Sequence, residues 1–198
     1  MTNQTPSKAT ASLFLIFTLS VVFSVYALLT PDFLRISKDP IFQLFSQEFG
    51  LFKTCITQGS STSCMQFPNE KCQIRFDGNF QNLSFCQSWL AARYLQIGAI
   101  LFGSLAWFGW LGHLILNKSI TALVIFWCSG LHALFQILVM QLMTSLREDN
   151  IFYLGGAYGN SFSALNASWG LSIGVIVMFA VTLLIKRQSV VYVYVPIP

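Results

Sequence analysis

Residues 50–64, GLFKTCITQGSSTSC, hold two cysteines, Cys55 and Cys64, on either side of a centre that is rich in turn-forming residues. That centre is Gln58-Gly59-Ser60-Ser61-Thr62, in which glycine and serine favour a reversal of the chain. The flanking residues alternate as strand residues do and include β-branched types: Phe52, Thr54, Ile56, Met65 and Phe67. The segment therefore predicts a β-hairpin closed by a Cys55–Cys64 disulfide, because facing strands bring two cysteines within bonding distance. The alternative is a pair of free, buried thiols.

The composition indicates a membrane protein. Of the 198 residues, 55% are hydrophobic, 15% are aromatic and only 9% are charged, whereas a soluble domain carries about a quarter charged residues. The net charge of +4 is small and the sequence has no basic, aromatic groove motif, so we expect no nucleic-acid partner. The sequence also lacks a nucleophile–base pair, a metal cluster and a phosphate loop, so we expect neither an enzyme nor a bound cofactor or metal.

Four apolar runs are long enough to cross a bilayer, which takes about 20 helical residues. The first run is interpreted as a retained span rather than a signal peptide, because it is long for a signal sequence and no small-x-small cleavage site follows it. The predicted fold is membrane α-helical: a four-helix transmembrane bundle with a small disulfide-pinned extracellular antiparallel β-sheet. The chain is predicted to be a single four-span domain (1–198), with spans at 11–29, 89–116, 120–143 and 169–185. The predicted extracellular loops are 30–88 and 144–168. The predicted cytosolic segments are the N-terminus (1–10), a turn (117–119) and the tail (186–198).

The first loop, residues 30–88, carries five basic residues, five acidic residues and four of the five cysteines. An even number of cysteines in one polar loop is typical of an oxidising compartment. Four cysteines allow three pairings, and Cys55–Cys64 with Cys72–Cys86 is favoured because each pair closes a local loop. Alternating runs in this loop predict a small sheet that is stable only when it is seated on the helices.

The basic residues predict that both termini are cytosolic. With the N-terminus inside, the inner face carries Lys8, Lys118, Lys186 and Arg187 and no acidic residue, whereas the outer loops carry six basic and seven acidic residues. The same orientation places the cysteine-rich loop outside the reducing cytosol.

Glycosylation sequons on either side of the membrane test this orientation. Asn82, in Asn82-Leu83-Ser84, lies outside and is predicted to be glycosylated, whereas Asn117 lies inside and is not. Asn166 also begins a sequon but is expected to lie too near the membrane for efficient modification.

Arg93 lies at the start of the second span, and two interpretations of it remain open. In the first, Arg93 is a clamp that hydrogen-bonds carbonyls of the loop or pairs with an acid such as Asp32 or Glu48. In the second, its side chain simply extends to the lipid headgroups.

Cys128, His132 and Gln136 share one face of the third span. A metal site needs more ligands than these, so the spacing predicts a polar stripe that is buried and hydrogen-bonded between helices. Ala99-x-x-x-Gly103 and Gly170-x-x-x-Gly174 are small-residue pairs of the kind that lets helices approach closely.

Taken together, these residues make the chain similar to the claudin-like superfamily, which includes the claudins, the peripheral myelin protein group and the calcium-channel gamma-type subunits. The first-loop pattern of that family is a Trp, followed by Gly-Leu-Trp-x-x-Cys and a second Cys. Gly50-Leu51-Phe52-Lys53-Thr54-Cys55 and Cys64 resemble it, with Phe52 in place of the second Trp. Leu34, followed by Arg35, stands at the position of the first Trp.

Two further stretches resemble the same superfamily. Leu90-Ala91-Ala92-Arg93 is similar to the claudin Gln-Ala-Ala-Arg stretch, and Tyr158-Gly159-Asn160-Ser161-Phe162 with Trp169 resembles a pattern before the fourth span. The two replaced tryptophans indicate a divergent member. The final residues, Val195-Pro196-Ile197-Pro198, do not fit the PDZ-binding motif with which most claudins end.

The resemblance implies a plasma-membrane protein of cell–cell contacts, acting in adhesion or as a paracellular barrier or channel through its first extracellular loop. Its partners would be itself or relatives, within one cell and between cells. Lys53 is the candidate for a charge that matters to a pore or partner; the alternative is a solvated strand residue. The gamma-type relatives imply instead an auxiliary subunit that modulates an ion channel or receptor, and the myelin-protein relatives imply membrane organisation.

Overall fold

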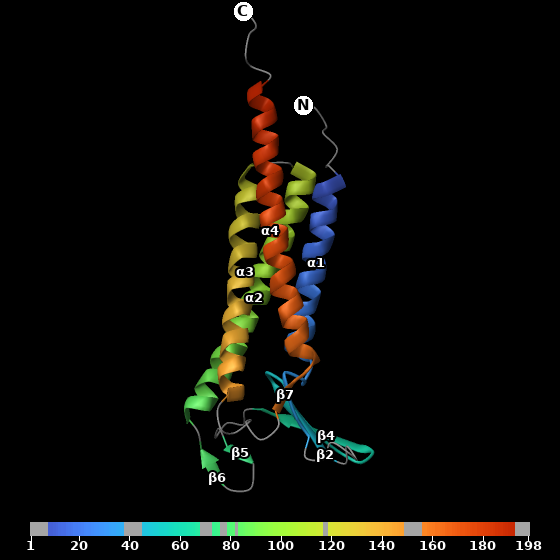
Figure 1. Ribbon diagram of the computed structural model, residues 1–198, viewed down its shortest axis with the longest axis vertical. Coiled ribbons are helices and arrows are strands. Elements are labelled where there is room, and N and C mark those ends of the chain that lie inside the picture. The colour runs from blue at the N-terminus through green and yellow to red at the C-terminus, as the bar shows by residue number, and fades with distance from the viewer. Residues whose placement is uncertain are drawn as a thin grey trace, which may run out of the picture.

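The computed structural model describes residues 8–37, 45–67, 73–75, 79–81, 83–116, 119–148 and 156–192. The helices form a bundle, and the strands lie at one end of it (Figure 1). The start of the first helix and the end of the last helix both lie at the opposite end (Figure 1). In chain order the elements are α1 (Lys8–Leu29), β1 (Leu34–Ser37), β2 (Phe45–Phe49), β3 (Lys53–Gln58), β4 (Ser61–Gln66), β5 (Gln73–Arg75), β6 (Asn79–Gln81), α2 (Leu83–Leu116), α3 (Ser119–Glu148), β7 (Gly156–Tyr158) and α4 (Asn160–Tyr192).

The described residues form four long helices, and each is long and apolar enough to cross a membrane, which confirms the predicted fold class. Their outward-facing side chains are apolar: Leu15, Leu101 and Trp127 expose 67%, 61% and 62% of their surface. Helices that are apolar on every side are typical of a hydrocarbon environment. The bundle therefore has the surface of a membrane protein.

The last helix begins earlier than the predicted span. It starts at Asn160 rather than near Trp169, and its apolar window runs to Ile185. Several serines and asparagines in residues 160–168 dilute the hydropathy of this stretch, so composition did not indicate a helix there. The structure shows why they are tolerated: Ser161 and Ser168 are fully buried against other elements, where their hydroxyls have partners.

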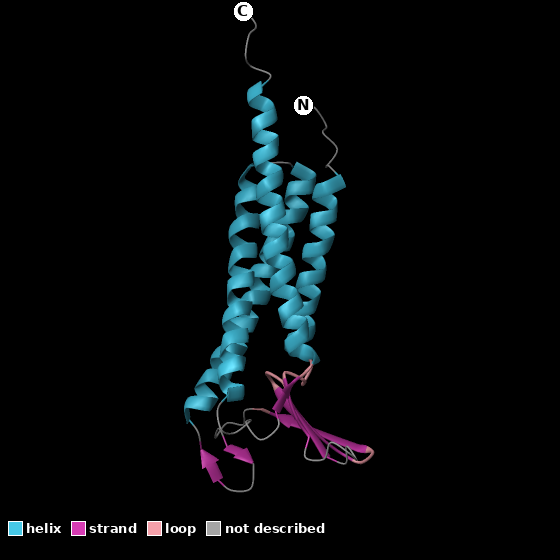
Figure 2. Ribbon diagram, viewed as in Figure 1, coloured by secondary structure: helices cyan, strands magenta, loops and turns pink. Residues whose placement is uncertain are grey.

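In the part of the chain that the structure describes, the larger sheet has five strands in the order β4-β3-β2-β1-β7, and every neighbouring pair is antiparallel. Figure 2 shows the strands gathered beyond one end of the helices. Four strands come from the segment between α1 and α2, as predicted. The fifth, β7, comes from the segment between α3 and α4 and pairs with β1, which the sequence did not predict. A separate antiparallel pair joins β5 to β6.

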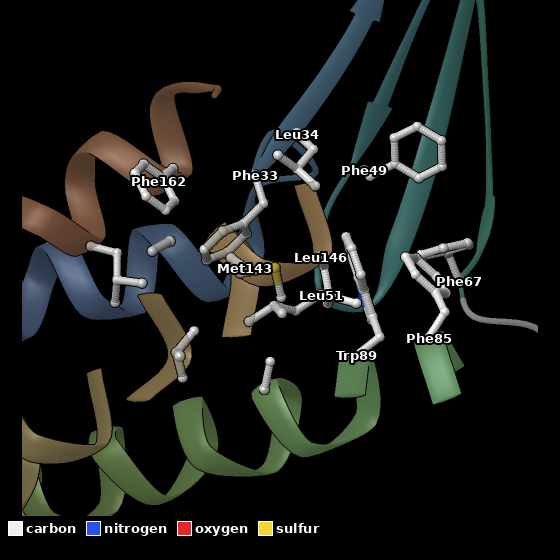
Figure 3. Close-up of a cluster of buried hydrophobic side chains, with 14 of the residues drawn as sticks. Phe33, Leu34, Phe49, Leu51, Phe67, Phe85, Trp89, Met143, Leu146 and Phe162 are labelled. Carbon is white, nitrogen blue, oxygen red and sulfur yellow. The ribbon is translucent and has the colours of Figure 1, made fainter. Parts of the chain in front are cut away.

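An apolar cluster joins the sheet to the bundle (Figure 3). Trp89 of α2 is fully buried there, with its ring 5.0 Å from that of Phe67 and 5.4 Å from that of Phe85. A sheet this small has too little core of its own, so contact with the helices stabilises it. The buried members of the cluster are Ala27, Phe33, Leu34, Ile36, Phe49, Leu51, Phe67, Phe85, Trp89, Ala92, Val139, Met143, Leu146, Phe162 and Leu165.

A second apolar cluster fills the bundle toward the end that lies away from the sheet. Within it, the rings of Trp110 and Phe179 are in contact, with their centroids 4.8 Å apart. Its buried members are Leu13, Phe17, Ala106, Trp110, Ile125, Val175 and Phe179.

Candidate functional site

The hairpin of β3 and β4 is present as predicted, and the disulfide closes it. Cys55 and Cys64 face each other in the register of the two strands and are bonded. Gly59, in the turn, has a φ of 60°, a conformation that glycine adopts without steric cost. The interpretation of Cys55 and Cys64 as free thiols is therefore wrong for this structure.

The sheet presents two chemically different faces. Leu34, Phe49 and Thr54 are aligned by the strand register and buried on the side of the apolar cluster. Arg35 and Glu48 are paired on the opposite face, in register with the disulfide. At the edge of the sheet, all six residues of β4 are exposed. The outer face and this edge are thus the surfaces that the sheet offers to another molecule.

Arg35 lies in an ion-pair cluster on the outer face. Its Nη2 atom is 2.7 Å from Oε1 of Glu48 and 3.5 Å from Oδ2 of Asp32. Asp32 is buried, and the same Oδ2 accepts a hydrogen bond of 2.9 Å from the backbone N–H of Asn160. A carboxylate at this position satisfies a free N–H group at the start of α4 and interacts favourably with the helix dipole. Asp32 thus joins the end of α1, the sheet and α4.

Two glycines allow the chain to pack closely at this junction. A Cβ atom on Gly50 would lie 2.5 Å from Cα of Pro31. A Cβ atom on Gly159 would overlap the carboxylate and backbone carbonyl of Asp32. The Gly50-Leu51-Phe52 motif therefore has a steric reason for its glycine, and Leu51 beside it is fully buried in the apolar cluster.

Arg93 is a clamp, as one of the two interpretations proposed. Its Nε donates a hydrogen bond of 2.8 Å to the carbonyl of Leu51, and its Nη2 donates to the carbonyl of Phe67. The guanidinium also lies 4.7 Å from the ring centroid of Phe52, which is 40% exposed. The suggested pairing with Asp32 or Glu48 is wrong, because both carboxylates pair with Arg35 instead.

Arg147 is a second clamp that sequence reasoning missed. It lies in the last turn of α3, donates through Nε to the carbonyl of Gly156 at 3.0 Å, and lies 4.2 Å from the ring centroid of Tyr158. Tyr158 stacks in turn on Phe162 of α4, with ring centroids 4.0 Å apart. The available signal was the presence of Arg147 within the polar segment of residues 144–168, just after the third apolar run. Two arginines thus anchor two parts of the sheet, the β3–β4 hairpin and β7, each through backbone carbonyl bonding and contact with an aromatic ring.

The predicted polar stripe of α3 is correct for two of its three residues. His132 and Gln136 are fully buried and belong to a hydrogen-bonded layer that also includes Ser20, Ser168 and Ser172. Cys128 is a free thiol that is partly buried against the second apolar cluster. Sequence reasoning did not find the serines, because a serine in an apolar helix does not indicate which neighbouring helix it faces.

The remaining predicted site residues are partly described. Lys53 is exposed and forms no ion pair with another described residue. Cys86 is buried and disulfide-bonded, whereas Cys72 and Asn82 lie outside the described residues.

No protein-family model matches this chain, and no curated protein matches it in sequence. The four apolar helices and the antiparallel sheet with its disulfide are compatible with a claudin-like layout. The likeness therefore rests on architecture and on local motifs.

Proposed function

We propose that this chain is a divergent claudin-like protein of the plasma membrane that acts at cell–cell contacts through its sheet. Both termini are cytosolic and the sheet is extracellular in this proposal. The basic residues Lys8, Lys186 and Arg187 support the orientation, because they lie in the helix ends away from the sheet. Adhesion, a paracellular barrier or a channel would each use the outer loops.

The observation that carries the proposal is the way in which the sheet is held. Arg93 holds the residues on either side of the β3–β4 hairpin to α2, Arg147 holds β7 to α3, and the disulfide closes the edge hairpin. A rigid sheet with an exposed edge strand and an exposed outer face is suited to pairing with a neighbour. Such preorganisation lowers the entropy cost of association.

The experiment uses cells that lack related proteins and express a tagged copy of the chain. Enrichment where two expressing cells touch is the expected result, and it should be lost in the double variant Cys55→Ser/Cys64→Ser. Cys128→Ser is the matched control, because Cys128 is a free thiol away from the sheet and its loss should leave the distribution unchanged. Surface labelling must show equal delivery of all three proteins. A uniform surface distribution of the unmodified protein would refute the contact function.

A second candidate is an auxiliary subunit that binds a channel or receptor laterally, and one observation favours it. Gly170 and Gly174 lie exposed on α4, and a Cβ atom on either would meet nothing within 4 Å. A helix face of this kind lets another transmembrane helix approach closely. Copurification of a larger membrane protein that is lost in Gly170→Leu/Gly174→Leu would support this candidate, whereas contact enrichment that survives the same variant would favour the first.

A further inference from the structure

We propose that His132 and Gln136 form a proton-responsive element that controls how tightly α1 and α4 are joined. The imidazole lies in the interior of the bundle, fully buried, between the two apolar clusters. The element is part of the helices themselves, so this proposal does not depend on what the sheet binds.

The hydrogen-bond partners of His132 indicate which ring nitrogen carries the proton. Nδ1 lies 2.7 Å from the carbonyl of Ala99, which can only accept, so Nδ1 carries the proton. Nε2 is then an acceptor, and it lies 3.3 Å from Nε2 of Gln136, which donates. The side-chain oxygen of Gln136 accepts no hydrogen bond from the described residues. The arrangement is therefore consistent with a neutral imidazole.

The same amide links the imidazole to the contact between α1 and α4. Nε2 of Gln136 donates at 2.7 Å to the hydroxyl of Ser168. That hydroxyl donates at 2.7 Å to the carbonyl of Ser20, while the hydroxyl of Ser20 donates at 2.9 Å to the carbonyl of Ser168. Ser172 adds a hydroxyl contact of 2.7 Å to Ser20. The two helices are thus joined by reciprocal serine bonds, and the Gln136 amide donates to one of the two hydroxyls that make them.

The groups that face the imidazole from the described residues are all uncharged. They are Ser20 and the ring of Phe17 from α1, the carbonyl of Ala99 and the backbone of Gly103 from α2, and Gln136 from α3. Ser168 of α4 faces Gln136 rather than the ring. No acidic side chain among the described residues is in contact with His132, so an added charge there is not neutralised by a neighbour.

Protonation at Nε2 of His132 reverses the hydrogen bond between His132 and Gln136 and, as a consequence, the bond between Gln136 and Ser168. An Nε2–H group cannot face the amide N–H of Gln136, so the amide turns and presents its oxygen to His132. That oxygen then also accepts the hydroxyl proton of Ser168, which no longer donates to the carbonyl of Ser20. The amide nitrogen comes to lie where its oxygen, which has no hydrogen-bond partner among the described residues, lay before. A charge inside the bilayer also favours entry of water. The protonated state therefore joins α1 to α4 with fewer bonds, as in other histidine switches.

The test uses the full chain in lipid nanodiscs with labelled histidine and glutamine side chains. At neutral pH, nitrogen NMR should show His132 with its proton on Nδ1; the variant His113→Gln identifies which of the two histidine signals belongs to His132. On acidification, His132 should gain a second proton over the same pH interval in which the Gln136 amide signal moves. A proton on Nε2 at neutral pH, a His132 that stays neutral down to the pH of unfolding, or a Gln136 signal that does not move would each overturn the proposal.

Amide hydrogen exchange measures whether the contact between α1 and α4 loosens. After correction for the intrinsic pH dependence, exchange near Ser20 and Ser168 should rise at least about fivefold when His132 is protonated, which corresponds to about 1 kcal/mol, the size of one lost hydrogen bond. The variant Gln136→Leu should lose this pH response, and Ser172→Ala, which leaves the His132–Gln136 pair intact, should keep it. Unchanged exchange in the unmodified protein despite a protonated His132 would refute the coupling, and this measurement needs no variant.

Discussion

Replacing Arg93 by methionine should release β3 and β4 from the bundle while the helices stay folded. Methionine keeps the length and apolar stem of the side chain but removes the bonds to the carbonyls of Leu51 and Phe67 and the contact with Phe52. Hydrogen bonds to a charged group contribute about 1.5–3 kcal/mol each when they are shielded from water. Arg93 is only partly buried, so the freed carbonyls regain some solvation. We therefore expect a loss of about 2–4 kcal/mol in total.

The assay is hydrogen exchange of two amides whose bonds depend on this anchor. They are the N–H of Gly50, bonded to the carbonyl of Lys53, and the N–H of Phe67, bonded to the carbonyl of Phe52. A loss of about 2–4 kcal/mol corresponds to roughly 30- to 1,000-fold faster exchange through local opening. Arg93→Lys should give an intermediate increase, because a lysine keeps the charge but not the planar fork that reaches two carbonyls.

The matched control is the neighbouring residue Tyr94, whose surface is 68% exposed. Tyr94→Phe should leave the exchange of Gly50 and Phe67 unchanged. If Arg93→Met altered neither amide, the clamp would contribute nothing to the position of the sheet. If exchange rose equally throughout the helices, Arg93 would be stabilising the bundle as a whole rather than anchoring the sheet.

Three further outcomes follow from the structure. The double variant Cys55→Ser/Cys64→Ser should lower the free energy of unfolding of the hairpin by about 2–3 kcal/mol; equal hydrogen exchange in oxidised and variant protein would contradict this. Asp32→Asn should destabilise the start of α4 by about 1–2 kcal/mol, because the charge at the helix N-terminus and the ion pair to an arginine are lost; chemical denaturation followed by fluorescence measures it, and an unchanged midpoint would refute the capping role. A glycan should be found on Asn82 by mass spectrometry and none on Asn117, since a modified Asn117 requires the opposite orientation in the membrane.

The parts of this structure that the sequence predicts well are local or periodic. The four helices follow from runs of apolar residues, and the hairpin follows from a turn between Cys55 and Cys64. For Arg93, its position in the sequence left two interpretations open, because an arginine at the end of a span can either bind loop carbonyls or extend to the lipid headgroups. Geometry decides between them through the carbonyls that the guanidinium meets.

The parts that the sequence does not predict depend on contacts between distant segments. Asp32 caps a helix that begins at Asn160, and no local pattern connects the two residues. Strand β7 has three residues, too few for the alternation that identifies a strand. The direction in which Ser20 and Ser168 face depends on the rotation of two helices that are apolar on every side, so their pairing becomes visible only in three dimensions.

The attachment of the sheet has a mechanical consequence. The chain itself connects β1 to α1 and β7 to α4, while Arg93 and Arg147 connect the sheet to α2 and α3. Because the sheet is attached to all four helices, it can tilt only if the helices move relative to one another. The angle between the sheet and the membrane plane is thus determined by the packing of the helices. A tilt or rotation of one helix would therefore change the direction in which the outer face of the sheet points.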